Sequence, residues 1–196
     1  SLSLLKSIGV EQVTLGGDTR FDRVHEIVRM APAVPLAEAF SRDVKVLVAG
    51  SIWPDDFRVL LPLINERKLR FIIAPHEISE RFITSIESGL RVPHERYSRA
   101  EQATVSSLQV LIIDNVGMLS SLYAYGDLAF VGGGFREGLH NILEAACYGL
   151  PVLFGNRAYN VYQEANDLIS MKAAFAVSDS HELRKTVEFL EQPHHY

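Results

Sequence analysis

Short apolar runs that alternate with helical patterns constrain the fold of this sequence more than any other feature. The runs are rich in Val, Ile, Leu and Phe, and they are apolar throughout rather than at every second position. Such runs are typical of strands buried on both faces, as in a parallel sheet. We expect strands at QVTL (12–15), VKVLVAG (44–50), LRFIIA (69–74), QVLIID (109–114), DLAFVG (127–132), PVLF (151–154) and AFAV (174–177).

Helical patterns separate these runs, and two of them begin with capping signals. Ser51 precedes Pro54 and two aspartates, and residues 178–180 precede Glu182. The alternation predicts an α/β fold class with a doubly wound parallel sheet, Rossmann-like, and right-handed crossovers. The polar stretch 91–107 is expected to be an irregular surface excursion. The expected helices are 54–68, 78–90, 140–149, 160–170 and 178–191.

The composition excludes several classes of protein. The chain has 196 residues, of which 47% are hydrophobic, which suits one domain. Its formal net charge is −5 with both signs interleaved, which argues against nucleic acid as a partner. No apolar run approaches the roughly 18 residues needed to cross a bilayer, and no histidine has metal-ligand spacing, so we expect neither metal nor cofactor. The chain begins on SLSLLKSIGV without Met, and we expect it to be a fragment of a longer protein.

The most informative segment is LAFVGGGFREGLHNILEA (128–145), in which a glycine-rich turn joins an apolar strand to a helix. In an open parallel sheet, ligands bind beyond the carboxyl ends of the strands, near free N–H groups at helix starts. Gly132, Gly134 and Gly138 have the wrong spacing for a dinucleotide fingerprint, and the next strand ends without a carboxylate. A nicotinamide-dependent oxidoreductase is therefore excluded.

His140, Asn141 and Glu144 lie in the first turns of the helix expected after this loop. Positions i and i+4 share a helix face, so His140 and Glu144 are expected to point the same way. A carboxylate there can accept hydrogen bonds from ribose hydroxyls while the loop meets a phosphate. The alternative is a capped, solvated helix start, and spacing alone does not decide between the two.

Two further strand ends carry weaker signals. In DNVGMLSSLYAYGD (114–127), Gly117 allows close approach of a base or phosphate, or simply makes a tight turn. In APHEISERF (74–82), His76, Glu77 and Arg81 suit acid–base or phosphate roles, although a polar helix start is equally common after a strand.

Taken together, these segments resemble the 3-deoxy-D-manno-octulosonic acid (Kdo) transferases, which build the inner core of lipopolysaccharide. The resemblance rests on GGDTRFDRV (16–24), VAGSIWPDD (48–56), IIAPHEISERF (72–82), VLIIDNVGMLSSLYAYGDLAFVGGG (110–134) and GLHNILEAACYGLPVLFGNRAYN (138–160). It implies a two-domain GT-B glycosyltransferase in which residues 1–196 form the carboxyl-terminal, donor-binding domain. The amino-terminal acceptor domain is then absent from this chain.

The same resemblance implies an inverting, metal-free transfer of Kdo from CMP-Kdo to a lipid A precursor. The intact protein would act at the cytoplasmic face of the inner membrane and associate with the membrane through its amino-terminal part. The catalytic base is expected in that missing domain. The fragment alone is expected to be soluble, to bind CMP weakly and to catalyse nothing.

Carried over to this sequence, the resemblance implies that Gly117 to Leu119 meet the nucleotide through backbone groups. It implies that His140, Asn141 and Glu144 hold the ribose and phosphate region of the nucleotide. Pro75 with His76 would lie beside the cytidine or phosphate. The family has Arg where this chain has His76, so Arg81 or another group must supply the phosphate-binding cation. The candidate donor-binding residues are Pro75, His76, Gly117, Met118, Leu119, Gly138, His140, Asn141 and Glu144.

Two other functions fit the same architecture. Sugar-nucleotide 2-epimerases also place a glycine-rich turn and a ribose-binding Glu at this sheet edge, but they use UDP-sugars. The third hypothesis is a non-catalytic nucleotide-binding or interaction domain. The preference between CMP and UDP separates the first two, and the absence of binding to either favours the third.

Overall fold

A seven-stranded parallel sheet forms the centre of the computed structural model, which describes residues 2–14, 16–136 and 138–192. The strand order is β3-β4-β2-β1-β5-β6-β7, and every neighbouring pair is parallel. The predicted fold class is therefore confirmed. The strands are β1 (Val46–Ile52), β2 (Arg70–Pro75), β3 (His94–Arg96), β4 (Val110–Ile112), β5 (Leu128–Val131), β6 (Val152–Gly155) and β7 (Ala174–Val177).

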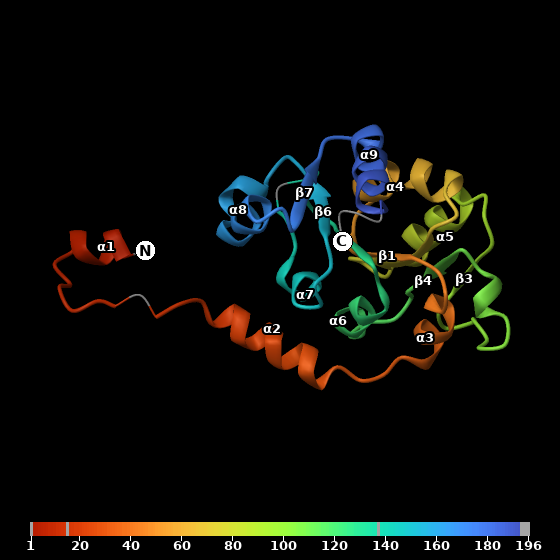
Figure 1. Cartoon of the computed structure of the whole chain (residues 1–196), viewed down its shortest axis with the longest axis horizontal. Coiled ribbons are helices and arrows are strands. Elements are labelled where there is room, and N and C mark those ends of the chain that lie inside the picture. Colours follow the sequence, from red (N-terminus) through yellow and green to blue (C-terminus); the bar gives the residue numbers. More distant parts are fainter. Residues whose placement is uncertain (1, 15, 137, 193–196) are drawn as a thin grey trace.

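Six of the seven expected strands are present, and the expected strand QVTL (12–15) is wrong. Residues 12–14 form no strand, and Leu15 lies outside the described residues. The segment lies away from the sheet and has no neighbouring strand with which to pair (Figure 1). The seventh strand is β3, inside the stretch expected to be irregular, where His94 lies opposite Val110 of β4.

Helices cover both faces of the sheet (Figure 1). One core lies between the sheet and the helices that include α4, α5 and α9, and a second lies between the sheet and those that include α3, α6, α7 and α8. Leu47 and Ala49 point into the first core, whereas Val46 and Val48 point into the second. The helices are α1 (Leu2–Ser7), α2 (Thr19–Met30), α3 (Pro35–Ser41), α4 (Pro54–Glu66), α5 (Glu80–Gly89), α6 (Leu119–Leu122), α7 (Leu143–Ala146), α8 (Gln163–Ser170) and α9 (Ser180–Leu190).

The helix starts agree only in part with the capping signals. At α9, Asp179 accepts hydrogen bonds from two backbone N–H groups, and Ser178 N donates to Glu182, as the pattern predicts. At α4 the helix begins at Pro54, as expected, but the expected cap Ser51 is wrong, because the N-cap is Trp53. Ser51 instead has a φ of 52° and lies where the register between β1 and β2 shifts. This bulge re-aims the chain at the carboxyl end of β1.

The strand order places the topological switch point between β1 and β5. From β1 the chain winds outward through β2, and it returns to the other side of β1 with β5. The helices that follow these strands, α4 and α7, pack on opposite faces of the sheet, while the loops that lead to them leave from the same edge. Open α/β sheets bind their ligands at such an edge. The segments that hold the candidate donor-binding residues follow β2, β4 and β5 and approach the same edge.

Candidate functional site

The loops after β1 and β5 meet at the switch point through two side chains. Trp53, the first residue after β1, donates its indole N–H to Nε2 of His140 across 2.9 Å. His140 follows the glycine-rich loop and is anchored by its own backbone N–H, which donates to Gly132 O. Two segments separated by 87 positions in the sequence are thus joined at the edge where a ligand is expected.

His76 completes a cluster of three rings with Trp53 and His140. Its ring centroid lies 4.4 Å from that of Trp53 and 4.3 Å from that of His140. The predicted candidates His76 and His140 therefore come together, although they follow different strands. Burial, and to a smaller extent the nearby His76, lower the pKa of His140, which keeps its imidazole neutral.

Asp56 supports this cluster from the first turn of α4. Its Oδ2 accepts hydrogen bonds from the backbone N–H of Trp53, at 2.8 Å, and of Gly133, at 3.0 Å. The side chain is buried, and within the described residues its Oδ1 has no partner. Burial raises the pKa of Asp56, and the two N–H donors oppose that rise. One carboxyl group therefore links the loop after β1 to the loop after β5.

The glycine-rich loop packs against the backbone of its neighbours. A Cβ on Gly132 would overlap the carbonyl oxygen of Ser51, and one on Gly134 would lie 2.8 Å from Gly155 Cα. Gly133 has a φ of +90°, which favours glycine. The N–H groups of Gly132 and Gly133 already donate to Gly50 O and to Asp56. These glycines are needed for close packing, and the N–H groups of Gly132 and Gly133 are not free for a phosphate.

Arg136, which follows this loop, brings a cation to the ring cluster. Its guanidinium lies 5.1 Å from the centre of a Trp53 ring and donates to Asp55 at 2.9 Å. That hydrogen bond is the main reason why the pKa of Asp55 is lowered. Arg136 and Arg81 line the same cavity of about 480 Å³, together with Trp53. Both are candidates for the phosphate-binding cation, because this chain has His76 where the resemblance implies an arginine.

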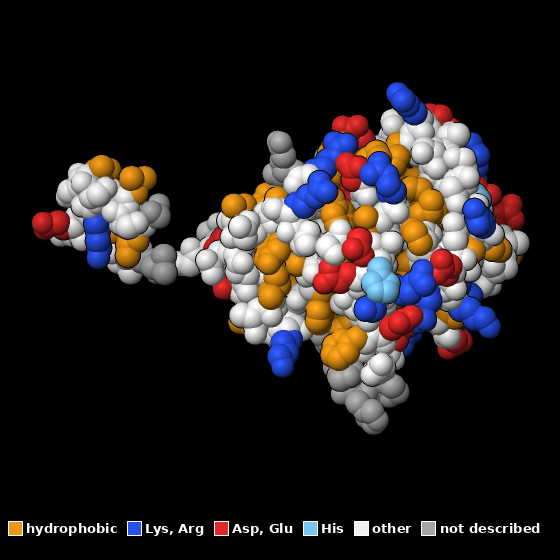
Figure 2. All heavy atoms as spheres, turned by 90° about the horizontal axis from the view of Figure 1, so that it is seen from above, with side chains coloured by type: hydrophobic (Ala, Val, Ile, Leu, Met, Phe, Trp, Pro, Cys, Tyr) orange, Lys and Arg blue, Asp and Glu red, His pale blue; other side chains and the backbone are white. Residues whose placement is uncertain are grey.

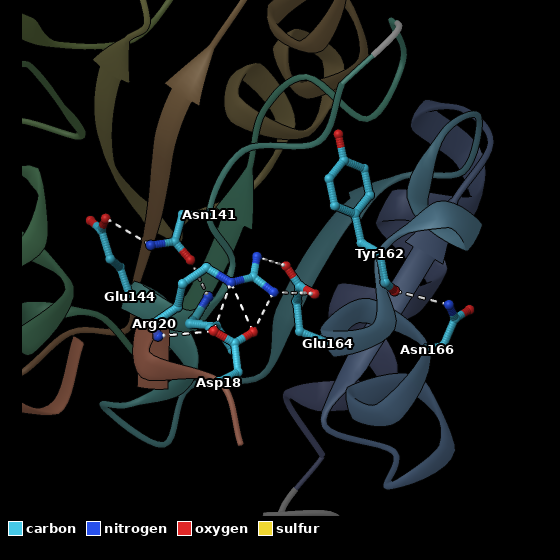
Figure 3. A network of polar contacts seen from close by, with 8 residues as sticks. Asp18, Arg20, Asn141, Glu144, Tyr162, Glu164 and Asn166 are labelled. Carbon is cyan, nitrogen blue, oxygen red and sulfur yellow. Dashed lines mark hydrogen bonds and ion pairs between the residues drawn. The ribbon is translucent and has the colours of Figure 1, made fainter. Parts of the chain in front are cut away.

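Glu144 and Asn141 lie in a different cavity, of about 390 Å³, between α2 and the α7 and α8 segments. Asn141 donates to Glu144 across 3.1 Å, and its Oδ1 accepts from the N–H of Leu143 (Figure 3). The Asn141 side chain therefore bonds the first N–H of the short helix α7 and orients the Glu144 carboxylate. The helix expected over 140–149 covers only Leu143–Ala146, so His140 precedes it and does not share a helix face with Glu144.

An ion-pair network borders this second cavity (Figure 3). Arg20, at the start of α2, is bound by Asp18 at 2.6 Å and by the buried carboxylate of Glu164 at 2.7 Å. These two carboxylates engage both terminal nitrogens of the guanidinium, so Arg20 holds α2 against α8 rather than offering a free cation. Arg23, one turn further along, lines the same cavity.

The remaining candidates have mainly backbone roles. Gly117 has a φ of +89°, which a turn before α6 requires, and its contact with a nucleotide stays a prediction. Met118 and Leu119 begin α6 and are partly buried against the second core. Gly138 has open space around its Cα, with only Tyr162 Oη at 3.6 Å from an added Cβ. Pro75 ends β2 and is buried.

The structure agrees with the charge pattern of the sequence. Figure 2 shows acidic and basic side chains interspersed over one face of the molecule. In the described part of the chain, no group of three or more His, Cys, Asp or Glu side chains is arranged to bind a metal ion. Across the same residues, every helix is too short or too polar to cross a bilayer.

Several curated proteins similar to this chain are Kdo transferases. The chain is 34% identical over 155 residues to the 3-deoxy-D-manno-octulosonic acid transferase of Chlamydophila psittaci, a match that covers 76% of this chain and 35% of that protein. The corresponding transferase of Rickettsia bellii is 26% identical over 197 residues, covering 98% of this chain and 47% of that protein. The chain is a homologue of these glycosyltransferases. It spans less than half the length of the relatives it matches, and no protein-family model matches it.

The fold is shared with a solved protein domain. The C-terminal CMP-Kdo binding domain of WaaA from Acinetobacter baumannii superposes with a TM-score of 0.67. The match has 24% sequence identity and covers 87% of this chain and 88% of that one. The predicted α/β fold, that of a GT-B carboxyl-terminal domain, is thus confirmed.

Three residues of the ring cluster and its support, namely Trp53, Asp56 and Arg136, were not predicted as site residues. Trp53 and Asp56 lie in the segment VAGSIWPDD (48–56), and Arg136 lies in the segment 128–145. The available signal was their position, because each lies within a few residues of the carboxyl end of β1 or β5. This position places the three residues in one site only when β1 and β5 are known to be neighbouring strands.

Proposed function

We propose that this chain is the donor-binding domain of a glycosyltransferase that moves Kdo from CMP-Kdo to a lipid A precursor in lipopolysaccharide core synthesis. The observation that carries the proposal is the meeting of His76 and His140 at the switch point in a homologue of Kdo transferases. The intact protein would work at the cytoplasmic face of the inner membrane. Its association with the membrane would come from the amino-terminal part of the transferase.

The chemistry assigned to this domain is stabilisation of the leaving group. In an inverting transfer, a base takes the proton of the acceptor hydroxyl while the donor's phosphate departs with its bonding electrons. We assign the base to the amino-terminal domain. We assign the contact with the CMP phosphate to neutral His140 and to the cations Arg81 and Arg136, which share a cavity with Trp53, the partner of His140. Contact with the ribose hydroxyls is assigned to Glu144 in the second cavity.

Nucleotide preference tests this proposal. CMP, UMP and UDP are titrated into the ¹⁵N-labelled chain, and binding is followed by amide chemical shifts and by the fluorescence of Trp53, the only tryptophan in the sequence. We expect CMP to bind more tightly than UMP, which differs from it only in the base, and more tightly than UDP. A clear preference for UDP would favour an epimerase-like domain, and no binding at millimolar concentration would contradict a nucleotide site altogether.

Replacing Glu144 tests its assignment to the ribose. Glu144→Gln is expected to weaken CMP binding by about 1–3 kcal/mol, because it removes a charged acceptor of hydrogen bonds. The matched control is Glu101→Gln, which alters an exposed carboxylate in the turn before the short helix Val105–Ser107. Calorimetry with CMP measures both variants. Equal affinity of Glu144→Gln and the wild type would rule out the ribose role.

A further inference from the structure

The hydrogen bond between Trp53 and His140 decides where the imidazole carries its proton. An indole N–H can only donate, so Nε2 of His140 must present its lone pair. A neutral imidazole that accepts at Nε2 bears its proton on Nδ1, whereas an imidazolium ion could not accept at all. The lowered pKa of His140, caused first by burial and then by His76, agrees with the neutral form.

Trp53 is itself held in place from three sides. Its backbone N–H donates to Asp56, the Arg136 guanidinium lies over its ring, and His76 packs against it with ring centroids 4.4 Å apart. A side chain with so many fixed contacts has few alternative rotamers. The direction of the indole N–H, and with it the choice of the His140 tautomer, is therefore built into the fold.

The Nδ1 atom of His140 is open to a ligand. Nδ1 makes no hydrogen bond within residues 2–14, 16–136 and 138–192, and it is not among the buried atoms that lack a partner. His140 lies at the edge of the sheet where the chain leaves the neighbouring strands β1 and β5, which is where the nucleotide is proposed to bind. An Nδ1–H group there can donate to an anionic oxygen without bringing a second positive charge.

We propose that Trp53 is a positioning residue that holds His140 in its neutral Nδ1–H tautomer, so that His140 donates a hydrogen bond to a phosphate oxygen of the bound nucleotide. This inference rests on the proposed function, because it names the phosphate contact of the same site. It also accounts for the loss of the arginine that the resemblance places at His76. His140, fixed by Trp53, would give the phosphate a hydrogen bond of defined direction. Arg136, which lies over the same indole, would give it a positive charge.

The tautomer can be measured without any ligand. Long-range ¹H–¹⁵N correlation spectra of the labelled full chain report which ring nitrogen of each histidine is protonated, and His140→Gln identifies the His140 signals. We expect Nδ1 to be protonated in the wild type. In Trp53→Phe, which keeps an aromatic ring but removes the N–H, the proton is expected to move largely to Nε2. A wild-type proton on Nε2, or an unchanged tautomer in Trp53→Phe, would overturn the proposal.

The ligand role of His140 is tested by a double-mutant cycle with CMP. Trp53→Phe and His140→Gln are each expected to weaken CMP binding roughly five- to tenfold, and the double variant no more than either single one. His94→Gln, on β3 at the sheet edge, is the control for a histidine replacement and should bind like the wild type. Additive losses, or full CMP affinity in Trp53→Phe, would contradict the proposal.

The two measurements separate the possible failures. A wild-type chain that bound no CMP would overturn the proposed function and the phosphate contact, while the spectra would still decide the role of Trp53. If Trp53→Phe did not fold, Trp53→Tyr would replace it, and the wild-type spectrum alone would still test the Nδ1–H tautomer.

Discussion

Gly132→Ala is expected to destabilise the fold by about 3 kcal/mol, the upper end of the usual range for an overpacked site. Gly132 directly follows β5 and lies against the carboxyl end of β1. An added Cβ would overlap Ser51 O and lie 2.7 Å from Ile52 Cα. Both are backbone atoms of a central strand, so they cannot rotate away. Relief would require β1 and β5 to separate, which would also strain the hydrogen bond from Gly132 N to Gly50 O.

The matched control for Gly132→Ala lies in the same loop region. Gly138→Ala places its Cβ 3.6 Å from Tyr162 Oη, an ordinary contact, and should change the free energy of unfolding by less than about 0.5 kcal/mol. Urea denaturation, followed by circular dichroism, measures both variants. Equal unfolding midpoints for the two would show that the loop can move away from β1, contrary to the packing described above.

Asp56→Ala is expected to lower the free energy of unfolding by about 2–4 kcal/mol. The substitution leaves the N–H groups of Trp53 and Gly133 without an acceptor, and each such loss costs about 1–3 kcal/mol when the donor is buried. Removal of a desolvated carboxyl group offsets part of this cost. We also expect the loop after β1 to separate from the loop after β5, so the fluorescence of Trp53 should change before global unfolding.

Asp56→Asn separates the charge from the hydrogen bonds. Because the pKa of Asp56 is raised in the folded state, the ionised carboxylate opposes folding above that pKa, and its contribution improves as the pH falls through it. Asn keeps an acceptor oxygen and removes the charge, so it should cost less than Ala in urea denaturation at neutral pH. If Asp56→Asn lost as much free energy of unfolding as Asp56→Ala, the charge itself would be required.

Most of the sheet could be predicted because its strands are buried on both faces. Such strands are apolar along most of their length, and β1, β2, β4, β5, β6 and β7 follow this pattern apart from Ser51 in β1 and Arg70 in β2. β3 could not be found this way, since it is an edge strand of three residues that includes His94 and Glu95. QVTL has the composition of a strand, but a strand forms only beside another strand, and residues 12–14 lie away from the sheet (Figure 1).

Part of the candidate site could be predicted from the sequence, and part could not. His76 and His140 were found because each follows a strand, and parallel strands end at a common edge. The expected helix face shared by His140 and Glu144 was wrong, because α7 begins only at Leu143, where the backbone N–H donates to the Asn141 side chain. Local periodicity cannot reveal such a competing side-chain hydrogen bond.

By itself, the sequence determined the α/β class, the approximate strand and helix positions, the likeness to Kdo transferases and the sheet edge at which a ligand should bind. These properties follow from local hydrophobic patterns and from motif order along the chain. Only the tertiary structure decided that Trp53 donates to His140, that Asp56 joins two loops, and that Glu144 lies in a cavity under α2. Those contacts depend on which strands are neighbours, and neighbouring strands such as β1 and β5 lie about 80 residues apart in the sequence.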